Sequence, residues 1–141
     1  MAKSYIDSNV FFYAKIDDKV FGPPCSSIIH RIAAGKLEAA SSALVLVEVA
    51  NALRKYGLGD EVAREVHAIC SLIADIYAID VTDVQEAAQI YGEAKVSPYD
   101  CLHAAVMRRN GVSAIISADR DFDKIRFLRR VDPRSTIQID R

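Results

Sequence analysis

The sequence predicts an α/β protein, a three-layer α/β/α sandwich around a central parallel five-stranded sheet. Two observations predict this class. Short apolar runs of strand length alternate with longer segments that carry helix caps, and strands separated by helices usually pair in parallel. The chain has 141 residues and shows no internal repeat or linker, so we expect residues 1–141 to form a single domain.

The first half of the chain is expected to supply two strands and four helical segments. A Gly-Pro-Pro loop precedes the second helix, since proline can open a helix and glycine can end one. Ser41 or Ser42 caps the next helix, and Asp60 caps the one after it. In order, we expect a strand at 3–7, a helical turn at 9–14, a helix at 26–34, a weak strand at 37–40, a helix to about 56 and a helix to about 74.

The second half is expected to supply three more strands and two helices. Thr82 and Gln85 have the spacing of a capping box. Ser97 and Pro98 open the last helix, and Gly111 ends it. In order, we expect a strand at 77–81, a helix at 82–94, a helix at 98–110, a strand at 112–117 and a short strand at 136–139.

Composition places the chain among globular proteins. Hydrophobic residues make up 51% and charged residues 26%, which is too apolar for a disordered chain. No run approaches the roughly 18 consecutive apolar residues of a membrane span, and no secretory signal is evident at the start. The three cysteines are widely spaced and form no CxxC pair, so neither a zinc site nor a disulfide framework is predicted. We therefore expect a protein of the reducing cytoplasm.

The charge is distributed unevenly, although the net charge is only −1. Residues 1–107 carry 9 basic and 14 acidic side chains, whereas residues 108–141 carry 9 and 5. A basic C-terminal quarter beside an acidic site suits a polyanionic substrate. An excess this small, taken alone, is more typical of an ordinary solvated surface.

Four acidic residues lie next to the ends of expected strands. Asp7 ends the first strand, and Glu48 lies in the helix after the second. Asp100 opens the helix before the fourth strand, and Asp119 follows that strand. In a parallel sheet such positions converge on one edge, where ligands usually bind. Because clustered carboxylates repel one another, we expect a divalent metal that neutralises them and assists hydrolysis of a phosphodiester.

Each acid also has a purely structural interpretation. Asp7 can cap a helix, and Asp100 has the position of the acid in a capping box. Glu48 can belong to a polar stripe, although its apolar neighbours favour a partly buried carboxylate. Residues 119–123 resemble the start of a calcium loop, but the glycine and glutamate that such a loop needs are absent. Asp80 is assigned to the turn before its helix and not to the site.

The stretches that surround these acids are similar to a known family. They are residues 5–9 (YIDSN), 46–53 (LVEVANAL), 98–105 (PYDCLHAA) and 116–123 (ISADRDFD). Together, and in this order, they resemble the PIN domain and, within that family, the VapC-like toxins of toxin–antitoxin pairs. The resemblance extends over essentially the whole chain.

The resemblance implies a metal-dependent endoribonuclease that leaves 5′-phosphate and 3′-hydroxyl ends. The ligands of Mg²⁺ or Mn²⁺ that it implies are Asp7, Glu48, Asp100 and Asp119, with Asp121 as a fifth acid. The polar residues that it implies in support of them are Ser8, Asn9 and Ser117. His103, one turn after Asp100, is interpreted as a helix histidine or as a group that supports the ligands.

The resemblance also implies partners. These are an RNA substrate, a second copy of the chain in a homodimer, and a small cognate antitoxin that inserts a segment near the acidic pocket. Basic side chains of the C-terminal quarter are candidates for phosphate contacts. The principal ones are Arg120, Arg126, Arg129 and Arg130.

Two other functions stay open at this point. A receiver-type phosphoacceptor domain is also α/β with an acidic Mg²⁺ pocket. It needs paired acids early in the chain, an acceptor aspartate after the third strand and a lysine after the fifth, and only Asp80 fits this pattern. A PIN-like fold can also serve as an RNA-binding or RNA-processing module outside a toxin pair.

Overall fold

A computed structural model describes residues 2–135 and contains one five-stranded parallel sheet within them. The order of the strands is β3-β2-β1-β4-β5, with every neighbouring pair parallel. The strands are β1 (Ser4–Ile6), β2 (Ala39–Ser42), β3 (Asp75–Tyr77), β4 (Ala114–Ile116) and β5 (Arg129–Val131). The predicted central parallel sheet is therefore confirmed.

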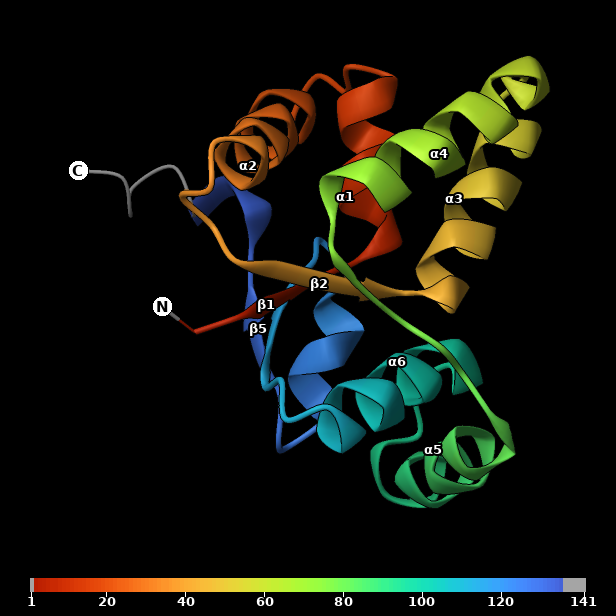
Figure 1. Ribbon diagram of the computed structural model, residues 1–141. Helices are drawn as coiled ribbons and strands as arrows, with labels where there is room; N and C mark the ends of the chain where they lie inside the picture. Colours follow the sequence, from red (N-terminus) through yellow and green to blue (C-terminus); the bar gives the residue numbers. More distant parts are fainter. Residues whose placement is uncertain (1, 136–141) are drawn as a thin grey trace.

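Helices cover both faces of this sheet. The α-helices are α1 (Ser8–Lys15), α2 (Gly22–Ala33), α3 (Ala43–Lys55), α4 (Val62–Leu72), α5 (Val81–Ala94) and α6 (Pro98–Arg109). Two short 3-10 helices accompany them, η1 (Gly59–Glu61) and η2 (Arg120–Lys124). Figure 1 shows α1–α4 together on one side of the sheet and α5 and α6 on the other. This arrangement confirms the three-layer sandwich.

The core lies against the two central strands. Tyr5 and Ile6 of β1 and Ile115 of β4 are fully buried, since these strands are covered on both faces. Phe11 of α1 and Met107 of α6 pack into the same core from opposite layers. No helix within residues 2–135 is long and apolar enough to cross a membrane.

The chain reverses its direction of travel through the sheet between β1 and β4. From β1 the chain proceeds outward to β2 and β3, and it then returns to the other side of β1 as β4. The loops that follow β1 and β4 therefore leave the same sheet edge in opposite directions. Such a switch point forms a crevice at the carboxyl ends of the strands, where α/β proteins bind ligands.

The third strand and its following cap differ from the prediction. The strand covers Asp75–Tyr77 and not 77–81, and α5 begins with a capping box of Asp80 and Asp83. Asp80 accepts hydrogen bonds from the Thr82 and Asp83 amides, and Asp83 accepts one from the Asp80 amide. Thr82 and Gln85 have the same spacing of three residues as Asp80 and Asp83, two positions later in the chain. The spacing alone therefore did not indicate which pair forms the capping box.

Helix α2 begins earlier than predicted, at Gly22, so the Gly-Pro-Pro segment is helical and not a loop. Prolines fit the first turn because their missing N–H groups would have no helical partner there. A Cβ at Gly22 would lie 2.9 Å from the carbonyl carbon of Asp17, so glycine permits this close turn.

The edge strand β5 was not predicted. Its sequence, Arg-Arg-Val, lacks an apolar run, yet its backbone pairs with β4 from Ala114 to Ile116. The strand predicted at 136–139 lies outside the described residues.

The capping box can be tested by substitution. Asp80→Ala removes the acceptor of two amides and should lower the free energy of unfolding by about 1 kcal/mol. Gln85→Ala, at an exposed position of the same helix, should change it by less than about 0.5 kcal/mol. Urea unfolding of both variants measures the difference, and equal losses would contradict the assignment of the cap.

Candidate metal centre

Asp7 is the buried centre of the crevice. It directly follows β1, caps α1, and is 5% exposed. Its Oδ1 accepts a hydrogen bond from the Ser8 amide at 2.8 Å. Its Oδ2 accepts bonds from Ser117 Oγ at 2.5 Å and Asn9 Nδ2 at 3.0 Å. Both oxygens of this carboxylate are therefore held in place by neighbouring donors.

Asn9 and Ser117 join the two loops of the switch point. Asn9 Nδ2 also donates to Ser117 Oγ at 3.1 Å, and Asn9 Oδ1 accepts from the Ala118 amide at 3.2 Å. Ser117 Oγ accepts in turn from the Asp119 amide at 3.0 Å. The structure thus places two of the three predicted supporting residues, Asn9 and Ser117, against the acids. Ser8 contributes mainly its amide, since its hydroxyl lies 3.5 Å from Asp7 Oδ1.

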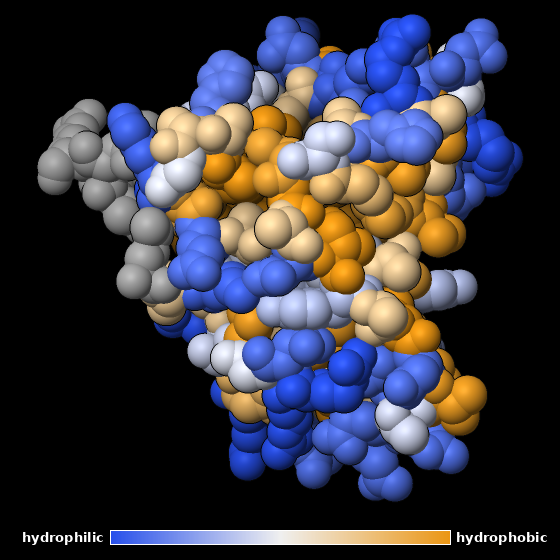
Figure 2. Space-filling model, viewed as in Figure 1, coloured by the Kyte–Doolittle hydropathy of each residue, from blue (hydrophilic) through white to orange (hydrophobic). Residues whose placement is uncertain are grey.

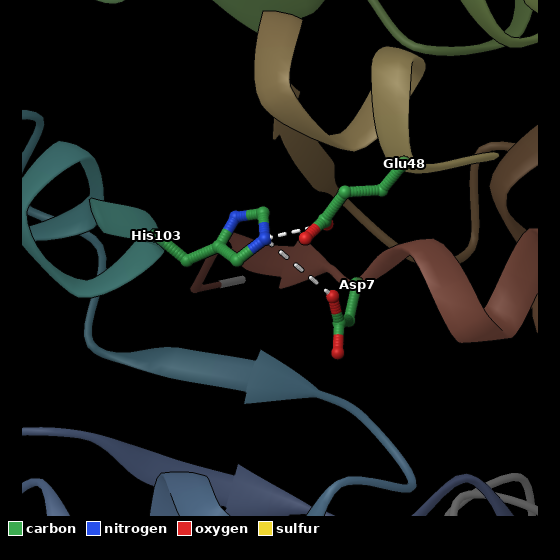
Figure 3. Close-up of side chains that lie close together, drawn as sticks. All are labelled: Asp7, Glu48 and His103. Carbon is green, nitrogen blue, oxygen red and sulfur yellow. Dashed lines mark hydrogen bonds and ion pairs between the residues drawn. The ribbon is translucent and has the colours of Figure 1, made fainter. Parts of the chain in front are cut away.

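Glu48 and His103 meet beside Asp7, as Figure 3 shows. Glu48 extends from α3, and its Oε1 lies 2.7 Å from Nε2 of His103 on α6. The same Nε2 lies 3.9 Å from Asp7 Oδ1. His103 is 1% exposed, whereas the Glu48 side chain is 26% exposed. Glu48 therefore spans from the buried imidazole toward solvent.

Asp100, Asp119 and Asp121 form the other group of acids. One carboxylate oxygen of each lies within 4.8 Å of the others. Asp100 is buried in the first turn of α6, and Asp119 caps η2 by accepting from the Asp121 amide at 2.9 Å. Asp121 is half exposed, and its Oδ1 lies 3.4 Å from the Lys124 ammonium.

Burial and mutual repulsion shift the protonation of these groups. Burial raises the pKa of Asp100 to about 8, with repulsion from Asp119 and Asp7 adding to the shift. Burial also raises the pKa of Asp7, although His103 and Ser117 counteract it. Burial alone would lower the pKa of His103, but the Glu48 hydrogen bond and the charge of Asp7 produce a net increase. Because Asp7 and His103 act on Asp100, the two acidic groups belong to one electrostatic site.

The donor set fits a hard divalent cation. Carboxylate oxygens from five acids face the crevice, and these are the ligands that Mg²⁺ and Mn²⁺ prefer. Burial and repulsion from Asp119 raise the pKa of the Asp100 carboxyl, and a nearby cation would favour its ionised form. Neither of the two candidate ligand groups within residues 2–135 contains a cysteine, so both lack the thiolates typical of structural zinc sites.

The arginines expected to contact RNA occupy different environments. Arg120, Arg126 and Arg129 are exposed, but Arg129 begins β5 and so lies at the amino end of the strand, away from the crevice. Arg130 is engaged within the chain, because its guanidinium pairs with Asp123 at 3.0 Å and donates to the Ser117 carbonyl at 3.0 Å. Its side chain is only 11% exposed.

His103 and Tyr5 are site residues whose importance the sequence underestimates. His103 lies between Glu48 and Asp7, and its Nδ1 lies 2.7 Å from the Tyr5 hydroxyl. The spacing of three residues after Asp100 places His103 on the same side of α6, which is a usable signal. Nothing in the sequence indicates that an apolar strand residue such as Tyr5 reaches it.

The topology excludes a receiver domain. That fold has the strand order 2-1-3-4-5, whereas this sheet has the order β3-β2-β1-β4-β5. Asp80, the only candidate acceptor, is an exposed helix cap beyond the edge strand β3. Its carboxylate is occupied by Thr82 and the Asp83 amide.

Solved structures share this fold at low sequence identity. A DNA-bound VapBC structure from Salmonella typhimurium matches with a TM-score of 0.71 at 19% identity, covering 94% of this chain and 99% of that one. VapC20 from Mycobacterium tuberculosis, described as a sarcin-ricin loop cleaving toxin, matches with 0.70 at 15% identity, covering 84% and 92%. A toxin–antitoxin complex from Klebsiella pneumoniae matches with 0.66 at 17% identity, covering 92% and 97%.

Comparison at the level of sequence gives two results. None of the curated proteins compared with this sequence matches it significantly. A family model for the PIN domain matches residues 4–128, from the start of β1 to the residue before β5, and so includes every acid of the crevice. With the family model spanning most of its length and the similar structures sharing its fold, this chain belongs to the PIN domain family.

Proposed function

We propose that this protein is a Mg²⁺- or Mn²⁺-dependent endoribonuclease, and that it is the toxin of a VapBC-type toxin–antitoxin pair. The observation that carries the proposal is the convergence of five acids on the switch point of a parallel sheet. Membership of the PIN family supports the nuclease activity. The similar solved structures, which are VapBC and other toxin–antitoxin proteins, support the toxin assignment.

The proposed roles follow from the geometry of the crevice. Asp7, Glu48, Asp100 and Asp119 would hold the metal, with Asp121 available as a more exposed fifth acid. A bound divalent ion would supply positive charge at the phosphate and a water that ionises more readily. Ser117 and Asn9 keep Asp7 oriented, and Ser8 adds its amide. Hydrolysis by water would leave a 5′-phosphate and a 3′-hydroxyl.

The substrate path would lie along the exposed basic side chains nearest the acids. Arg120 directly follows Asp119 and is exposed, and Arg126 lies exposed just beyond η2. Arginine side chains at such positions can neutralise phosphates on either side of a scissile bond. Arg129 lies farther from the acids, and Arg130 donates a hydrogen bond to the Ser117 carbonyl in the turn after β4.

A protein partner is supported by the surface of the first helical layer. Figure 2 shows apolar residues gathered over the middle of the face, below a hydrophilic upper margin of the α1–α4 side. Val20, Val47 and Tyr56 are each more than half exposed in this layer. Exposed apolar surface of this kind marks protein contacts. We assign the contacts to a small antitoxin and to a second copy in a homodimer. The free cysteines favour a reducing cytoplasm.

Metal dependence is the first expected property. The purified protein should cleave single-stranded RNA with Mg²⁺ or Mn²⁺, stop in EDTA and recover with excess metal, because carboxylates alone offer no positive charge to the phosphate. Asp7→Asn should abolish cleavage while the protein remains folded by its melting curve. Asp60→Asn, the same change at an exposed acid, should cut normally. Undiminished cleavage in EDTA would exclude the mechanism.

The raised pKa of Asp100 predicts an inverted pH dependence without metal. A native carboxyl with a pKa of about 8 keeps a proton that the unfolded chain loses near pH 4. The native state then binds more protons at Asp100, so the contribution of this group to stability should fall as pH rises from about 4 to 8, by at most about 1.4 kcal/mol per pH unit.

Asp100→Asn cannot titrate, so in EDTA its stability should depend less on pH than that of the wild type. Saturating Mn²⁺ should flatten the wild-type curve as well, because metal binds the ionised acid and is favoured by rising pH. Urea unfolding at pH 5, 6, 7 and 8 measures both slopes. Parallel curves for the wild type and the variant in EDTA would refute the electrostatic account.

The substrate path can be tested through salt dependence in an Asp7→Asn background, which prevents cleavage. Arg120→Gln should weaken RNA binding and reduce the slope of log affinity against log salt by about 1. Arg64→Gln, an exposed arginine on α4, is the matched control. Arg130→Gln should instead lower stability, because it releases Asp123 and the Ser117 carbonyl. The path would be misplaced if the Arg120 and Arg64 variants had equal slopes.

A further inference from the structure

A buried row of hydrogen-bonding groups stands behind the acids. The Tyr5 hydroxyl donates to Ser42 Oγ at 2.7 Å and lies 2.7 Å from His103 Nδ1. The other ring nitrogen, Nε2, lies 2.7 Å from Glu48 Oε1. Tyr5, Ser42 and His103 are at most 1% exposed. The row connects β1, the end of β2 and α6 to one carboxylate on α3.

The direction of the bond to Glu48 follows from its chemistry. An ionised carboxylate can only accept hydrogen bonds, so the Nε2 atom that faces Glu48 must carry a hydrogen. A ring nitrogen that carries a hydrogen has no lone pair to give to a metal. His103 therefore faces the acids as a hydrogen-bond donor. It does so although its ring nitrogen lies close enough to the Asp7 and Glu48 oxygens for all three to bind one metal ion.

The row closes a loop through helix α3. Ser42 is the N-cap of α3 and accepts from the Val45 amide, while Glu48 lies on the same helix. Tyr5 and His103 bridge these two points from outside the helix. Tyr5 and Phe122 also contact the imidazole edge-on, with ring centroids 5.6 Å and 6.2 Å away. The plane of the imidazole is thus fixed from several sides.

We propose that His103 is a positioning residue of the acidic site, held by Tyr5 and holding Glu48. One Glu48 oxygen is committed to the imidazole, which would leave the other available to a bound metal. Glu48 is the most exposed of the Asp7–Glu48–His103 group and has a long side chain, so without this bond it would sample several rotamers. The inference rests on the proposed metal-dependent function.

Mn²⁺ binding by calorimetry tests the proposal without relying on activity. Tyr5→Phe and His103→Leu should weaken Mn²⁺ binding by about 10- to 100-fold, the usual effect of removing groups that orient metal ligands. His103→Gln retains an N–H group for Glu48 and should bind Mn²⁺ more tightly than His103→Leu. The matched controls are Tyr91→Phe and His67→Gln, both exposed, and they should bind as the wild type does. Melting curves in EDTA establish that each variant is folded.

A spectroscopic measurement separates positioning from ligation. Pulsed electron paramagnetic resonance of Mn²⁺ bound to the wild type should show no coupling to a directly coordinated nitrogen. Such a coupling, lost in His103→Gln, would make His103 a ligand and overturn the proposal. Wild-type Mn²⁺ affinity in both Tyr5→Phe and His103→Leu would also overturn it. If the wild type itself bound no Mn²⁺, the proposed function would fail, and this inference with it.

Discussion

The mutual repulsion of carboxylates at one sheet edge is the constraint on which the rest of this structure depends. Asp7 is nearly buried, and a buried charge is costly unless donors or opposite charge surround it. Ser117 and Asn9 supply the donors, and to do so the loop after β4 must meet the start of α1. Arg130 then holds that loop from β5 through the Ser117 carbonyl. The two loops of the switch point are therefore joined by hydrogen bonds that centre on the Asp7 carboxylate.

Three of the acids proposed to bind the metal lie at the starts of helices. Asp7 caps α1, Asp119 caps η2, and Asp100 lies in the first turn of α6. Amide groups at helix starts carry partial positive charge, which partly offsets the repulsion between the acids. The cap interpretation is therefore correct for Asp7, whereas α6 is capped by Ser97 and not by Asp100. The caps orient the acids toward the crevice and do not compete with a role in binding.

The sequence was sufficient to predict the three-layer sandwich and the proximity of the acids, because the carboxyl ends of parallel strands all lie at the same edge of the sheet. It was insufficient where local signals were ambiguous or where the partner was distant. Near Asp80, two sequence patterns with the spacing of a capping box overlap, and only the one of Asp80 and Asp83 forms the box. Strand β5 pairs through its backbone although it begins with two arginines. The sequence of Arg130 and its neighbours is that of an exposed cation, because nothing in it indicates the ion pair with Asp123. His103 gained its importance only from contacts 55 and 98 residues away.

The positive charge available to the acids is distributed unequally. Asp7 and Glu48 share the imidazole of His103, which lies within 3.9 Å of both. Among the described residues, the ion pair recorded at the other group joins Lys124 to the half-exposed Asp121 and not to buried Asp100. Burial and the charges of Asp119 and Asp7 raise the pKa of Asp100 to about 8, and burial raises the pKa of Asp7 as well. An external cation would therefore stabilise the ionised forms of both buried acids, Asp7 and Asp100.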